Sequence, residues 1–185
     1  MKLHLNEAQM LKEWHLRSFP EEVNSGCTIE RHYGIDMEAY LKAAMNDWYR
    51  RMLHDVDALH LLSAVDIADE VTEVLTGEVN PYTSLSPCRI TLPDGVIRIL
   101  SVMVDGWHSP ARVVDADHHL ARACRSPFPP GGLYSPVAVV DGSTLTLYSV
   151  PSETTSIKAI SAIVDTPGIY HIDSAALATI KPLFA

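Results

Sequence analysis

Apolar and polar residues recur with a helical period over the first part of the chain. Asn6 is a favourable N-cap and Gln9 stands three positions later, as in a capping box, which predicts a helix over residues 7–17. Asp36 is placed to cap a second helix with one wide apolar stripe. The stripe comprises Met37, Tyr40, Leu41, Ala44, Met45, Trp48 and Met52. We expect this face to be core or interface.

A third helix is predicted from about Ser63 to Thr76, with Gly77 as its stop. Its outward side would carry Asp66, Asp69, Glu70 and Glu73, and no basic residue stands at helical spacing to pair with them. The loop spacing that binds calcium is missing from this stretch. The predicted acidic face therefore stays in water or meets a basic partner.

The pattern after Pro81 changes to that of strands. A run over Val96–Val104, the Asp105-Gly106 turn and a return over Trp107–Val114 predict a first hairpin. Ser109-Pro110 makes that return an edge or broken strand. A second hairpin is predicted from residues 136–140 and 144–150, and a last strand over residues 156–164.

Two short helices and a loop complete this prediction. Residues 115–123 could form a short helix, and Asp173 or Ser174 could cap a last helix near the end of the chain. The loop 127–136 is stiffened by prolines and would expose aromatic side chains. We take Phe128, Pro129 and Tyr134 on this loop as candidate interface residues, together with Asp66, Glu70 and Glu73.

These elements predict an α+β fold. A helical region of about three helices spans residues 1–80, a small antiparallel β region of two hairpins spans residues 81–170, and a short C-terminal helix spans residues 171–185. With 185 residues, the chain is expected to form one folded unit overall.

Charge changes the picture more than composition does. The net charge is −9, and residues 1–80 carry 7 Lys/Arg against 15 Asp/Glu, whereas residues 81–185 carry 7 against 8. Because phosphate backbones attract clustered Lys and Arg, this balance disfavours tight nucleic-acid binding. No apolar run reaches the roughly 20 residues of a membrane span, and the N-terminus lacks a secretory signal pattern.

Chemistry-bearing patterns are weak. Asp115, Asp117, His118 and His119 form the best local metal hypothesis, although adjacent histidines usually point apart and a solvated turn is the plainer interpretation. The three cysteines, Cys27, Cys88 and Cys124, show no C-x-x-C pair and are interpreted as buried thiols. No nucleophile or phosphate-binding motif is present, so we expect no enzyme, no metal and no cofactor.

One stretch resembles a known family. Residues 88–113, which include Leu92-Pro93-Asp94, Arg98 and Trp107, resemble the L-P-D-D-hydrophobic-R-hydrophobic pattern and the W-x-R-P-V element of head–tail connector (neck or ring adaptor) proteins of tailed phages and prophages. The strands over residues 136–140, 145–149 and 156–164 follow in the family's order. The chain departs from it at Gly95, where a second acidic residue is usual, and at His108-Ser109.

The resemblance covers roughly residues 85–170 and implies a structural protein without catalytic residues. In that family helices form a bundle with a β part inserted or appended, and copies assemble as a ring between portal and tail. The implied partners are further copies of the chain and portal or tail proteins. DNA would pass through the ring without tight binding, and no membrane is involved. The implied location is the bacterial cytoplasm or the virion. Two alternatives stay open: a small metal-dependent hydrolase using His118, His119 and Asp115, and a host-encoded module that binds a basic partner.

Overall fold

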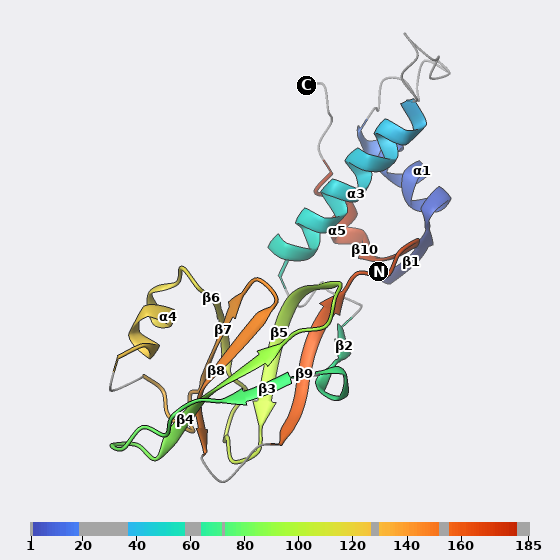
Figure 1. The fold of residues 1–185 in the computed structure, drawn as a ribbon. Coiled ribbons are helices and arrows are strands. Elements are labelled where there is room, and N and C mark those ends of the chain that lie inside the picture. Colours follow the sequence, from blue (N-terminus) through green and yellow to red (C-terminus); the bar gives the residue numbers. More distant parts are fainter. Residues whose placement is uncertain are drawn as a thin grey trace. The chain divides into compact units, whose positions relative to one another are not determined.

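The computed structural model describes residues 2–18, 37–57, 64–71, 73–126, 130–151 and 156–180. The chain divides into two compact units. Unit 1 comprises Met1–Ser63 and Thr166–Ala185, and unit 2 comprises Ala64–Asp165. Unit 2 is thus inserted in the sequence of unit 1, as the colours of Figure 1 allow the reader to follow.

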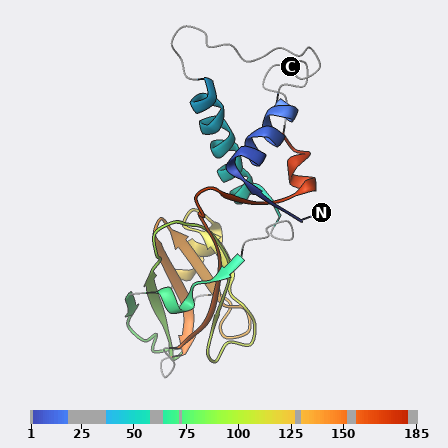
Figure 2. The same ribbon diagram turned by 90° about the vertical axis from the view of Figure 1, so that its right-hand side faces the viewer.

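Unit 1 joins a two-stranded sheet to helices (Figure 2). Its elements are β1 (Lys2–Asn6), α1 (Glu7–Ser18), α3 (Met37–Asp55), β10 (Ile169–Asp173) and α5 (Ser174–Leu177). β1 and β10 pair antiparallel, from Lys2 opposite Asp173 to Asn6 opposite Ile169. Segments from the two ends of the sequence are therefore held together by backbone hydrogen bonds. No helix of the described residues is long and apolar enough to cross a membrane.

The helix signals in unit 1 are largely confirmed. The Asn6 N–H donates to Gln9 Oε1 at 3.0 Å and the Gln9 N–H donates to Asn6 Oδ1 at 2.9 Å, which is the predicted capping box. At the other end of the sequence, Asp173 Oδ1 accepts from the Ala175 N–H at 2.8 Å and caps α5. Asp36, the cap predicted for the second helix, lies outside the described residues.

The buried face of α3 keeps the predicted period. Leu41, Met45 and Met52 are buried as expected, while Tyr40 is exposed and Tyr49 is buried in its place. The ring of Tyr49 packs edge-on against Tyr170 of β10, with centroids 4.9 Å apart. The Tyr170 hydroxyl donates to Asn46 Oδ1 at 2.6 Å, so its polar end is satisfied too. These contacts attach α3 to the β1–β10 sheet.

Unit 2 contains two sheets. A three-stranded antiparallel sheet has the order β2-β9-β5, built from β2 (Ala64–Asp66), β9 (Ile157–Val164) and β5 (Val96–Val104). A five-stranded sheet has the order β3-β4-β8-β7-β6, built from β3 (Glu73–Thr76), β4 (Leu85–Thr91), β8 (Thr144–Pro151), β7 (Val137–Asp141) and β6 (Arg112–Asp115). The β6–β7 pair is parallel. A 3-10 turn, η2 (Ala68–Glu70), and α4 (His119–Cys124) complete the unit.

Both sheets contribute to one core. Ile90 and Leu145 from the five-stranded sheet, and Val102 and Ile160 from the three-stranded sheet, are fully buried in the same cluster. Burying an aliphatic side chain of this size stabilises a fold by about 1.5–3 kcal/mol. Trp107 is also part of this core, and its indole Nε1–H donates to the Ser149 carbonyl at 2.8 Å. The core of unit 2 is therefore formed between sheets and not beneath a helix bundle.

The predicted fold class is wrong. We expected three N-terminal helices followed by two hairpins and a short helix, but the described residues form three sheets, and strands extend from β1 near the N-terminus to β10. The error has three sources: a helix was predicted where strands form, one turn was interpreted as a local hairpin, and the strands β1, β4 and β10 were not predicted.

The predicted helix over residues 63–76 is replaced by β2, η2 and β3. The carboxylate of Asp66 accepts from the Ala68 N–H at 3.0 Å, a local bond that competes with helix formation. The same oxygen accepts from the Ile160 N–H of β9 at 2.9 Å. Ile67 is fully buried in the core. The predicted acidic helix face does not exist, because tertiary pairing outweighed the helical spacing.

The first predicted hairpin is also wrong, although β5 has the predicted bounds, Val96–Val104. β5 pairs with β9, and the return segment forms β6, which pairs with β7 in the other sheet. Pro110 removes a backbone donor from the return segment and so weakens local pairing there. The second hairpin, β7–β8, is confirmed, as are the strand β9 and the short helix α4.

Candidate functional site

The rings of His118 and His119 lie with their centroids 4.2 Å apart, so these adjacent histidines do not point apart as expected. His118 is the N-cap of α4, and its Nδ1 accepts from the Leu120 N–H at 3.2 Å. Burial, with the nearby charges of His119 and Arg112, holds the pKa of His118 below its ordinary value. Among the residues that the structure describes, no three His, Cys, Asp or Glu side chains are placed to hold a metal ion. His118 therefore has a structural role at the start of α4.

The two described cysteines are buried and free. Burial raises the pKa of both thiols, Cys88 and Cys124, above the ordinary value. A thiol must lose its proton to act as a nucleophile, so burial opposes the reactive thiolate form of both. Cys27 lies outside the described residues.

The predicted interface residues fall on different elements. Phe128 and Pro129 lie outside the described residues. Tyr134 is strongly exposed, and its ring stacks on His108 with centroids 4.3 Å apart. Asp66 is engaged by backbone N–H groups, as described above. Glu70 is exposed on η2, and Glu73 begins β3 opposite Thr91. Whether these residues form an interface stays a prediction.

A different surface lies along the outer side of β3. β3 pairs with β4 on one side, and on its other side no strand of the described residues pairs with it. Large apolar side chains are nevertheless exposed here and in the connection to β4: Val74 by 42%, Leu75 by 65%, Val79 by 49% and Tyr82 by 72%. We call these four residues the β3 edge. An open strand edge with apolar side chains is prone to pair with another chain.

The connection from β3 to β4 is shaped by Asn80. Its side-chain Oδ1 accepts from the Tyr82 N–H at 2.9 Å, and its backbone N–H donates to the Leu85 carbonyl at 2.8 Å. The Asn80 carbonyl accepts from the Ser84 N–H at 2.9 Å, with Ser84 in the left-handed region at φ 55°. These bonds close a compact turn that carries Tyr82 at its tip.

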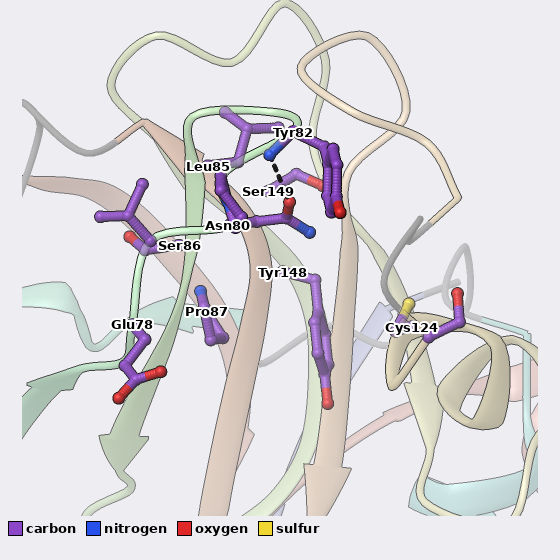
Figure 3. A pocket seen from close by; sticks show the side chains of 12 residues that line it. Glu78, Asn80, Tyr82, Leu85, Ser86, Pro87, Cys124, Tyr148 and Ser149 are labelled. Atoms are coloured by element: carbon purple, nitrogen blue, oxygen red, sulfur yellow. Dashed lines mark hydrogen bonds between the residues drawn. The ribbon is translucent and has the colours of Figure 1, made fainter.

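Beneath this turn lies a pocket of about 290 Å³ (Figure 3). The turn and the start of β4 supply one part of its lining, from Glu78 to Pro87, and Tyr148 and Ser149 of β8 supply another. Cys124 and Ser126 at the end of α4 complete it. In Figure 3, Glu78 and Pro87 lie on one side of Tyr148, and Cys124 lies on the other. The walls are mostly apolar, with a few polar groups among them.

A bulge between β4 and β8 opens this pocket. Ser86 pairs with Val150 and Cys88 pairs with Leu147, so Pro87 stands opposite both Tyr148 and Ser149. Pro87 has no N–H to donate, which suits a bulge inside a sheet. Ser149 takes up the extra length in the left-handed region, at φ 68°. That region is strained for any residue with a Cβ.

Two serines of the pocket carry unsatisfied hydroxyls. Ser86 is 1% exposed and Ser149 is 3% exposed. Within the described part of the chain, neither hydroxyl has a hydrogen-bond partner. A buried polar group without a partner costs about 1–3 kcal/mol. Together with the strained Ser149 backbone, this is the kind of local conflict that tends to mark functional positions.

One weak indication of this site is present in the sequence. Asn80-Pro81 is a turn signal, and it follows Gly77 closely. Ser149 carries no such signal, because its left-handed conformation arises from the bulge and not from residue type. Comparison with protein-family models, with curated proteins and with solved structures found no match.

Proposed function

We propose that the protein is a structural subunit of a tailed-phage or prophage head–tail connector, acting by self-association and by docking to portal or tail proteins. The observation that carries the proposal is the β3 edge. Val74 and Leu75 are exposed on a strand whose outer backbone groups have no strand partner among the described residues, and Val79 and Tyr82 are exposed in the connection that follows it. Such an edge favours contact with another protein chain.

The arrangement of the two units adds support. The resemblance over residues 85–170 implies a β part inserted in or appended to a helical part. Unit 2, which is built of sheets, is inserted between α3 and β10 of unit 1. This chain order supports the proposal, although unit 1 contains the β1–β10 sheet beside its helices and is not the expected helix bundle.

Mass photometry and analytical ultracentrifugation of the purified chain, alone and with a portal protein, test the proposal. We expect oligomers or a portal complex, and we expect Leu75→Lys to abolish them, because a charge on the β3 edge opposes burial. Ser143→Lys is the control, since Ser143 is exposed in the β7–β8 turn of the same unit and lies on no open strand edge. A strict monomer that does not bind portal at high concentration would contradict the proposal.

A host-encoded module with a basic partner is the second candidate. Asp69, Glu70 and Glu78 are exposed in the segments before and after β3, so the β3 edge has acidic surroundings. Pull-down from the native host at low and high salt separates the candidates. A complex that lacks phage proteins and dissociates at about 0.5 M salt would favour the second candidate, since salt screens exposed charges.

A further inference from the structure

The pocket beneath the β3–β4 turn has a particular chemistry. Glu78 is the single charged residue among the described residues that line it. Tyr82 and Tyr148 supply aromatic rings, and Ser86 and Ser149 supply hydroxyls that have no partner in the described chain. In Figure 3 the Ser149 side chain extends toward the Tyr82 ring. Arg125, although it lies between two lining residues in sequence, does not line the pocket.

We infer that this pocket receives the arginine side chain of a partner protein segment that lies along the β3 edge. A guanidinium is planar and cationic, it stacks on aromatic rings, and it offers five N–H donors. The Glu78 carboxylate can accept two of these donors. The buried hydroxyls of Ser86 and Ser149 can accept others once the pocket opens around an inserted side chain. The apolar stem of arginine suits walls of tyrosine and proline. The inference deepens the proposed function and rests on it, because it names the chemistry of the partner.

The size of the pocket points to one side chain. Sites for drug-sized ligands usually span about 300–1,000 Å³. The pocket, at about 290 Å³, lies just below that range. A single long side chain is therefore a better match than a cofactor.

The pocket is continuous with the β3 edge. β3 ends at Thr76, and the Gly77 N–H that follows donates to the Pro87 carbonyl at 2.7 Å. Glu78 and Val79 come next and line the pocket. A partner strand paired with β3 would therefore pass the mouth of the pocket as it leaves β3. Backbone bonds would give such a segment affinity, and the inserted side chain would give it specificity.

Titration with N-acetyl-arginine methylamide, followed by NMR of backbone amides, tests the inference on the full chain. We expect shifts centred on residues 78–87 and 148–149, with a dissociation constant on the order of 1 mM, as suits a ligand of this size. The citrulline analogue has the same shape without the charge, and we expect about tenfold weaker binding. Glu78→Gln should weaken the arginine probe about threefold, whereas Asp94→Asn, another exposed carboxylate of unit 2, should not.

Equal binding of the arginine and citrulline probes would overturn the inference, as would shifts outside the pocket or none at about 20 mM probe, well above the expected dissociation constant. Because the probe needs no assembly partner, the titration is independent of the oligomerisation test. If the chain assembles with portal but does not bind the probe, the proposed function stands and the inference of an arginine pocket is rejected. An amide spectrum of each variant shows whether its fold is intact.

Discussion

His4 and His171 lie directly opposite each other on β1 and β10, with their Nδ1 atoms 2.6 Å apart. At this distance one ring must donate an N–H and the other must accept it, so the pair can hold at most one extra proton without placing two cations in contact. The backbone of His171 is fixed from α3, since its N–H donates to the Tyr49 hydroxyl at 3.0 Å. Protonation of these two imidazoles is therefore expected to affect the stability of the β1–β10 sheet.

Unit 1 should lose stability as the pH falls. Burial, followed by the charge of His4, lowers the pKa of His171 below its ordinary value. A basic group with a lowered pKa in the folded state takes up its proton more readily when unfolded, so folding is opposed below the unfolded pKa of about 6.5. We expect the thermal unfolding midpoint, followed by far-UV circular dichroism, to fall between about pH 7 and pH 5.

Two variants separate this pair from general acid sensitivity. His4→Gln removes the imidazole that faces His171 and should reduce the pH dependence, while the part that comes from the burial of His171 remains. His54→Gln, at an exposed position on α3, should leave the dependence unchanged. If both variants follow the wild-type curve, the pair does not control the stability of the β1–β10 sheet.

Asp66→Ala should destabilise unit 2, because Asp66 joins β2 to β9. Its carboxylate accepts from the N–H groups of Ile160 and Ala68, and these bonds hold the pKa of Asp66 below its ordinary value. A carboxyl with a lowered folded pKa stabilises the fold above its unfolded pKa, and the contribution is lost as the pH falls through the folded value. We expect a midpoint a few degrees lower at pH 7 for the variant, and a smaller difference at about pH 3.

Asp69→Ala is the control for this prediction. On a helix over residues 63–76, Asp66 and Asp69 would share one exposed face and behave alike. In the observed fold Asp69 is exposed on η2, whereas Asp66 is bonded across to β9. Equal effects of the two substitutions would contradict the observed strand pairing.

The sequence specified local structure in unit 1 better than pairing in unit 2. The Asn6–Gln9 capping box and the period of α3 depend on neighbours three or four positions away, and both were predictable. The partner of β5 is β9, more than fifty residues later in the chain. The spacing of apolar residues and the identity of turn residues do not reveal pairing over such a separation. The Asp105-Gly106 turn was therefore wrongly interpreted as the turn of a local hairpin.

The candidate site was hidden for the same reason. The strand β3 was assigned to a helix because Val71, Leu75 and their neighbours match helical spacing as well as strand spacing. The pocket depends on a bulge between β4 and β8, which no residue type announces. Only the turn at Asn80 carried a local signal, through its side-chain bond to the Tyr82 N–H.

Gly77→Ala should destabilise unit 2 through a steric clash with Pro87. A Cβ at Gly77 would lie 2.7 Å from Pro87 Cγ and 3.2 Å from the Pro87 carbonyl oxygen. The hydrogen bond from the Gly77 N–H to that carbonyl holds the two segments together, so the backbone cannot move apart without losing it. We expect a loss of about 1–3 kcal/mol in the free energy of unfolding, as is usual for overpacking, measured by urea denaturation.

A double-mutant cycle with Pro87→Ala tests the cause. Removing Pro87 Cγ should recover part of the loss, since the carbonyl contact remains after the ring is gone. An interaction free energy of about 0.5 kcal/mol or more is expected for residues in contact. Strictly additive effects would show that Gly77→Ala acts by another route.

Ser149 combines two unfavourable features, a left-handed backbone at φ 68° and a buried hydroxyl without a partner in the described chain. Ser149→Ala removes only the hydroxyl, whereas Ser149→Gly removes the hydroxyl and relieves the backbone. In urea denaturation, we expect the free energy of unfolding of Ser149→Ala to exceed that of the wild type by about 1 kcal/mol. For Ser149→Gly we expect an increase of about 1–2 kcal/mol. Ser149→Thr should destabilise the fold, because a branched side chain is disfavoured in this conformation. If the hydroxyl is kept for a partner's arginine, both stabilised variants should bind the arginine probe more weakly, and stabilisation without weaker binding would argue against that role.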